Sequence, residues 1–157
     1  MNKLPSYTIL FFRFVMVILG FFSIFFYPMK FGYEGSYSSY YDDIPLIFVT
    51  IFTFTSFGLF LHSDWKWKIP SLSLVFLSLF SKFDFPTIHY TSAIIFFLSS
   101  TIAMWNDKRV FGFGRLSLIT YPLFFLDLLL FEFIHIFLIC LFHLIYILKL
   151  FLLKLSK

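Results

Sequence analysis

The last quarter of the chain, Leu116 to Lys157, constrains the fold most, because its polar residues recur with a helical period. At ~100° per residue, the charged and histidine side chains all fall on one half of a helix. We predict one continuous amphipathic helix, since no Gly, Asn or Pro follows Pro122. At ~1.5 Å per residue it would measure about 60 Å, twice the hydrocarbon thickness of a bilayer, so it must project, lie along the membrane or bend. The ionisable residues of this polar stripe are Asp127, Glu132, His135, His143, Lys149, Lys154 and Lys157.

The composition indicates a chain that lies in lipid. Hydrophobic residues make up 61% of the sequence and charged residues 13%, against about a quarter charged in soluble domains. We expect an all-α integral membrane protein with the lipid bilayer as its surroundings. The net charge of +4 includes no basic block, so nucleic acid is not an expected partner. Cys140 is the sole cysteine, which excludes an internal disulfide, and we expect no cofactor.

Four apolar segments precede the amphipathic helix. We predict a four-span membrane domain over residues 1–110 and the amphipathic helix over residues 111–157. The third segment is too short for a standard span and would be a short or re-entrant helix. The fourth carries small residues at Ser92, Ser99 and Ala103, a face that permits close helix packing. The segments are Thr8 to Phe26, Ile44 to Leu61, Pro70 to Phe80 and Thr87 to Trp105.

Cations gather on one side of this arrangement. Lys3, the turn at 63–69 and the loop at 106–115 share a side, whereas Lys30 and Lys82 lie on the other among four acidic residues. The positive-inside rule predicts a cytoplasmic N-terminus in a bacterial inner membrane. The lysines at the end of the amphipathic helix would also agree with this rule if they faced the lipid of the cytoplasmic leaflet. These lipid-facing cations are Lys149, Lys154 and Lys157.

The loop between the first two segments reads Gly35-Ser36-Tyr37-Ser38-Ser39-Tyr40-Tyr41. It resembles the first loop of small uncharacterised bacterial multi-pass membrane proteins, in which Gly-Ser-x-Ser-x-Tyr-Tyr precedes the second helix. The resemblance implies a topology and no particular activity. The tyrosines suit an interfacial aromatic belt, and Asp42 and Asp43 are placed to cap the next helix.

Arg13 lies about two turns inside the first segment, where a charge needs water or a partner. We consider two arrangements. The side chain would extend to the near interface, or it would pair with Asp127 or Glu132 inside the bundle.

The polar stripe gives the leading functional hypothesis. In a symmetric oligomer it would line a wet path, because ionisable residues in hydrocarbon need partners or water. We predict a non-catalytic, assembling membrane subunit that associates with its own copies or with another membrane protein and forms an oligomeric pore or membrane effector. Alternatively, the stripe pairs with Arg13 and Lys82 of neighbouring helices. The predicted pore or bundle-interior residues are Arg13, Asp127, Glu132, His135 and His143.

The alternative function is that of an intramembrane metal-dependent lipid hydrolase, with His62, Asp64 and His89 as candidate ligands. This set resembles the seven-span metal-dependent lipid amidases, which use a Ser, an Asp and several His. The chain departs from that pattern by having fewer spans. His135 and His143 are also eight residues apart, not at the four-residue spacing that lets two imidazoles share a metal on a helix.

Overall fold

The computed structural model describes residues 6–32, 35–36, 39–40, 45–62, 64–107, 110 and 112–156. Every regular element in those residues is helical, which confirms the all-α prediction. Three helices are long and apolar enough to cross a bilayer, namely α1 (Tyr7–Phe31), α5 (Pro86–Asn106) and α8 (Leu128–Leu155). The shorter elements are α3 (Pro45–Phe60), η2 (Trp65–Trp67), α4 (Lys68–Leu79), α6 (Phe113–Thr120) and α7 (Leu123–Leu126).

The four predicted apolar segments correspond to α1, α3, α4 and α5. Helix α1 runs on to Phe31, where Gly32, at φ +85°, ends it by donating its N–H to the Pro28 carbonyl. The third segment is short as predicted, because α4 has 12 residues. Helix α3 has 16 residues and measures about 24 Å, which is also less than an ordinary span. Hydropathy therefore located the helices, but of these four only α1 and α5 have spanning length.

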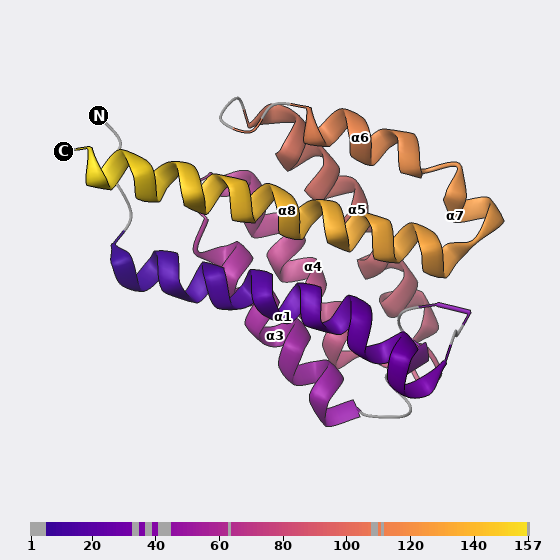
Figure 1. Ribbon diagram of the computed structural model, residues 1–157. Helices are drawn as coiled ribbons and strands as arrows, with labels where there is room; N and C mark the ends of the chain where they lie inside the picture. The colour runs from indigo at the N-terminus through magenta and orange to yellow at the C-terminus, as the bar shows by residue number, and fades with distance from the viewer. Residues whose placement is uncertain are drawn as a thin grey trace.

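The prediction of one continuous helix from Leu116 is wrong. The chain turns at Tyr121 and Pro122, and again at Asp127, whose backbone is extended at φ −154° and ψ 97°. Asp127 caps α8, because its Oδ1 accepts the Leu130 N–H at 2.9 Å. The segment therefore folds back as a hairpin, with α6 and α7 running one way and α8 the other (Figure 1). Helix α8, with 28 residues and a length of about 42 Å, is a candidate span.

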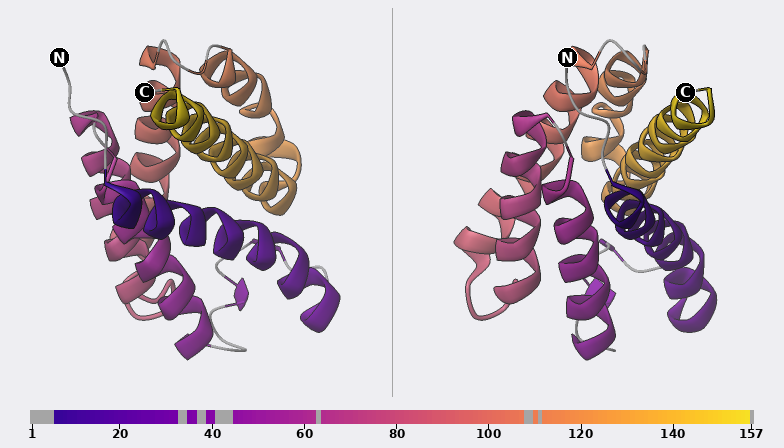
Figure 2. Two further views of the ribbon diagram at one scale, coloured as in Figure 1. Left: turned by 60° about the vertical axis from the view of Figure 1, so that its left-hand side comes forward. Right: turned by 90° about the vertical axis from the view of Figure 1, so that its left-hand side faces the viewer.

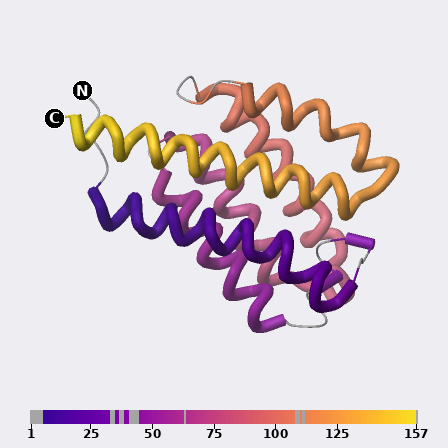
Figure 3. The backbone as a smooth tube through the Cα atoms, viewed as in Figure 1, coloured from indigo at the N-terminus to yellow at the C-terminus, as the bar shows by residue number. Residues whose placement is uncertain are grey.

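The helices form a closed ring of neighbours. Helix α1 packs on α3, α3 on α4, α4 on α5 and α5 on α6, and α8 closes the ring against α6 and α1. Figure 2 shows α1 and α8 side by side across from α3, α4 and α5. In the tube of Figure 3, the first turn of α1 and the last turn of α8 lie at the same end of the bundle. There the Lys154 ammonium lies 3.8 Å from the centre of the Tyr7 ring.

Small residues set the closest helix crossings. Ala103 is buried on the small-residue face of α5. Nearby, α6 approaches so closely that a side chain on Gly114 would collide with the Trp105 backbone. Gly20 of α1 faces the Cys140 thiol of α8 in the same way. These crossings hold the polar residues of α8 against α1, α5 and α6.

Candidate functional site

The polar stripe of α8 faces the interior of its own bundle. His135 and His143 are 0% exposed, and Glu132 is 7% exposed. Three features follow one another along the helix. They are a cavity beside Glu132, a hydroxyl network around His135 and, around His143, a cationic cluster that contains Arg13, His62, Trp67 and Tyr146. Of the predicted interior residues on α8, Glu132, His135 and His143 therefore face other helices of the same chain.

The cationic cluster joins α1 to α8. Arg13 Nη2 lies 2.9 Å from His143 Nδ1, and the guanidinium carbon lies 4.4 Å from the centre of the Tyr146 ring. Because arginine only donates, His143 accepts at Nδ1, and the neutral ring carries its proton on Nε2. Arg13 is 1% exposed, so its side chain is enclosed by the protein. Glu132, a partner predicted from the sequence, precedes His143 by eleven residues, about 16 Å along α8.

The connection between α3 and α4 supplies the rest of this cluster. His62 Nδ1 accepts the Asp64 N–H at 3.0 Å, and His62 Nε2 lies 3.9 Å from Asp107 Oδ2 after α5. The Trp67 ring, 0% exposed, has its centre 4.3 Å from that of His143. Within the described residues, Trp67 Nε1 and His143 Nε2 have no hydrogen-bond partner. The cluster thus brings together donor groups of α1, η2 and α8.

Hydroxyl groups of α5 and α6 surround His135. Ser117 Oγ lies 3.1 Å from His135 Nε2, and Ser100 Oγ and Thr101 Oγ1 each lie 3.3 Å from the same atom. Thr101 Oγ1 also lies 2.7 Å from Ser117 Oγ and 3.1 Å from the Tyr121 hydroxyl. This network gives a buried imidazole the partners that it requires. It ties α8 to both α5 and α6.

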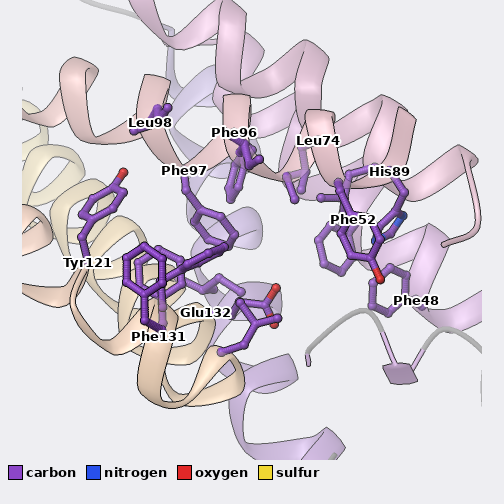
Figure 4. Close-up of a pocket in the computed structure, with 18 residues that line it drawn as sticks. Phe48, Phe52, Leu74, His89, Phe96, Phe97, Leu98, Tyr121, Phe131 and Glu132 are labelled. Carbon is purple, nitrogen blue, oxygen red and sulfur yellow. The ribbon is translucent and has the colours of Figure 1, made fainter. Parts of the chain in front are cut away.

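A cavity of about 500 Å³ lies beside the first turns of α8, among α3, α4, α5 and α7. Its walls are mostly aromatic and aliphatic, and none of the described lining residues is Lys or Arg. Glu132 contributes a carboxylate and His89 an imidazole (Figure 4). His89 Nδ1 is engaged elsewhere, because it lies 2.7 Å from the Phe80 carbonyl. Glu132 is thus the acidic group among the described residues of a mostly apolar chamber.

The three candidate ligands of the hydrolase alternative do not come together, because His89 lies far from His62 and Asp64. His62 lies beside Asp107 after the end of α5, whereas His89 lies in the first turn of α5, about 27 Å away along the helix. Asp64 caps η2 by accepting the Lys66 N–H at 3.1 Å. Within the residues that the structure describes, no three His, Cys, Asp or Glu side chains gather as a metal-binding group.

The remaining predicted residues lie outside these three groups. Asp127 is half-buried at the start of α8, where it serves as the helix cap. Lys149 is exposed and Lys154 half-buried near the end of α8. Tyr40 is buried, where it stacks on Tyr27 and donates its hydroxyl proton to the Gly32 carbonyl at 2.7 Å. The predicted residues Lys3, Asp42, Asp43 and Lys157 lie outside the described residues.

Sequence reasoning missed the partners of the stripe. Trp67, Tyr146 and the hydroxyls of Ser100, Thr101 and Ser117 are buried beside the two histidines. Adjacent Ser and Thr residues inside an apolar segment were the available signal, since such hydroxyls bond across helices. Comparisons with protein-family models, curated proteins and solved structures found no match to this chain.

Proposed function

We propose that the protein is a non-catalytic integral membrane protein whose long helices α1, α5 and α8 cross the bilayer. The distribution of side chains supports this, because Arg13, Glu132 and the four histidines are buried, whereas large apolar groups cover the outside of the long helices. A bilayer favours this arrangement, since lipid solvates apolar groups and leaves ionisable ones without partners. Outward-facing examples are Phe11, Phe25, Ile94, Ile102 and Leu152.

We further propose that both ends of the described chain face the cytoplasm of a bacterial cell. The end of the bundle that holds the first turn of α1 also carries most of the described cations, which favours the cytoplasmic side. Because α8 returns to this end, its lysines agree with the positive-inside rule. The cations at this end are Lys66, Lys68, Arg115, Lys149 and Lys154, and those at the opposite end are Lys30 and Lys82.

Single-cysteine labelling tests this orientation. In a Cys140→Ser background, Phe83→Cys reports on one end and Trp65→Cys on the other, and both positions are exposed. A membrane-impermeant maleimide applied to whole cells should label Phe83→Cys, whereas Trp65→Cys should react only after the cells are permeabilised. The reverse pattern would overturn the orientation.

Within the membrane we propose the role of an assembling subunit. The observation that carries this proposal is the burial of the α8 stripe inside one chain. A pore lined by Glu132, His135 and His143 of several copies would require α8 to leave α1, α5 and α6. The subunit role requires no such change, because a second copy or another membrane protein would meet the apolar outer surface.

The mass of the purified protein in lipid nanodiscs, followed by single-channel recording on the same sample, tests the subunit role. We expect a complex larger than a monomer that conducts no ions. A conductance altered by Glu132→Leu would favour the pore or membrane effector. A monomer that copurifies with no other protein would overturn assembly. Bound zinc in elemental analysis, lost in His62→Ala, would favour the lipid hydrolase.

A further inference from the structure

The cavity beside the first turns of α8 opens onto the side of the bundle. Its rim is formed by residues of α5 and α7 that are themselves 40% to 86% exposed, and all of them are apolar or aromatic. Because α5 is one of the helices proposed to cross the bilayer, a molecule that reaches this rim passes through lipid and must be lipophilic. The rim residues are Tyr90, Ile94, Leu98, Phe124 and Phe125.

Aromatic rings form much of the inner wall. Phe48 and Phe52 of α3 lie across the chamber from Phe97 of α5 and Phe131 of α8 (Figure 4). The volume of about 500 Å³ lies in the range of small-molecule sites. Aromatic rings pack well against one another in offset or edge-to-face arrangements. The wall therefore favours a small ligand that carries an aromatic ring.

His89 supplies a hydrogen-bond acceptor to this chamber. It lines the cavity beside Phe48 and Phe52 in the view of Figure 4 and is 3% exposed. Its Nδ1 must donate to the Phe80 carbonyl at 2.7 Å, because a carbonyl oxygen only accepts. In the neutral ring Nε2 is then an acceptor. This atom makes no hydrogen bond within the described residues and is not enclosed by them, so it is available to a ligand.

The polar groups of the cavity suit a neutral ligand. The described lining residues include no Lys or Arg, so they offer no counter-ion to an anionic head group. An uncharged ligand also makes no demand on the charge of Glu132, whose carboxyl group accepts a hydrogen bond with or without its own proton. A single hydroxyl group satisfies an acceptor in apolar surroundings and avoids the cost of burying an ion. A phenol combines such a hydroxyl group with an aromatic ring.

We propose that this cavity binds an uncharged lipophilic phenol, whose hydroxyl group donates to His89 Nε2 and whose ring packs against the aromatic wall. The phenol enters from the bilayer between α5 and α7. This binding role goes beyond the proposed assembly and requires no partner chain, so its failure would leave the subunit role standing.

Calorimetry on the purified full-length protein in detergent tests the site with a matched pair of probes. We choose para-pentylphenol and para-pentylanisole, because they share the ring and the alkyl chain and only the phenol has a hydroxyl proton to donate. At about pH 8 an imidazole with its ordinary pKa of about 6.5 is neutral, and so is the phenol. We expect the phenol to bind at one site per chain, about threefold to tenfold more tightly than the anisole. Equal affinity for the two probes would overturn the proposal and leave a purely apolar site.

A second comparison assigns the preference to His89. His89→Asn keeps an N–H group for the Phe80 carbonyl and removes the acceptor at Nε2, so the preference for the phenol should fall below twofold. Asn106→Ala, at the exposed end of α5 and outside the cavity, should leave the preference unchanged. An undiminished preference in His89→Asn would contradict the proposal.

A third comparison places the probes in the cavity. Ala93 lines the chamber, so Ala93→Phe should fill it and abolish the binding of both probes. Ile102→Phe, on the exposed side of α5 and outside the cavity, should have no effect. Unchanged binding in Ala93→Phe would put the probes elsewhere and overturn the proposal. If His89→Asn or Ala93→Phe fails to fold in a thermal unfolding assay, the difference between the two probes on the unaltered protein decides the question.

Discussion

Arg13 and His143 stand 130 residues apart in the sequence and meet in the interior, with 2.9 Å between Nη2 and Nδ1. The contact turns the polar stripe of α8 toward α1. It also explains how an arginine two turns inside an apolar helix is accommodated, since a buried cation needs a hydrogen-bond acceptor. The two helices that close the ring are thus joined by a polar contact as well as by apolar packing.

Removing the acceptor should destabilise the bundle. In His143→Leu the Arg13 guanidinium loses the nitrogen that receives its Nη2 proton, so we expect a loss of about 1–3 kcal/mol in the free energy of unfolding. Denaturant unfolding in detergent measures this quantity. In a double-mutant cycle with Arg13→Met, the two losses should not add, because the residues are in contact.

The control for this prediction lies on the same helix. Lys149 is exposed, and Lys149→Met should change the free energy of unfolding by less than about 0.5 kcal/mol. A loss as large as that of His143→Leu, or strict additivity in the cycle, would mean that the Arg13 contact contributes nothing specific.

Replacing the other buried histidine should cost less. In His135→Leu, the Ser100 and Thr101 hydroxyls keep the Phe97 carbonyl as an acceptor, at 2.9 and 3.0 Å. We therefore expect a loss of about 0.5–1.5 kcal/mol, within the range for neutral hydrogen bonds. The same unfolding assay, run beside His143→Leu, ranks the two histidines. A larger loss for His135→Leu would show that the hydroxyl network depends on the imidazole.

The crossing of α1 and α8 should be sensitive to a single methyl group. A side chain at Gly20 would overlap the Cys140 thiol, so Gly20→Ala should lower the free energy of unfolding by about 1–3 kcal/mol. Combining it with Cys140→Ala should recover part of this loss by making room. Gly35→Ala is the matched control, since nothing lies within 4 Å of its added Cβ, and it should leave stability unchanged. Absence of rescue by Cys140→Ala would argue against the close approach of Gly20 and Cys140.

The antiparallel packing of α1 and α8 should be detectable by cross-linking. In a Cys140→Ser background, Tyr7→Cys and Lys154→Cys should be joined by a short bifunctional maleimide, because the native side chains are in contact. Tyr7→Cys paired with Leu126→Cys should not react, since Leu126 lies at the opposite end of α8. Efficient joining of the second pair would contradict the fold. A mobility shift on denaturing gels measures both reactions.

Hydropathy and periodicity predicted the helical class, the approximate bounds of α1, α3, α4 and α5, and the short length of α4. They failed at the junction before α8. Whether the chain turns at Pro122 and Asp127 depends on how the surrounding helices pack. The sequence on both sides is apolar, so it does not indicate a turn. The predicted pore or bundle-interior residues were Arg13, Asp127, Glu132, His135 and His143. In the structure Asp127 is half-buried at the start of α8, and the other four are buried within the chain.

The sequence by itself determined that this chain is helical, that its long helices suit a bilayer and that α8 has one polar face. The tertiary structure decided what that face meets. Helical periodicity fixes the direction of a side chain around its own axis but carries no information about which helix lies opposite. Arg13, Ser117 and Glu132 acquire their surroundings from segments distant in sequence, and the hairpin at Asp127 sets which ones. The stripe is therefore satisfied within one chain because the chain folds back on itself.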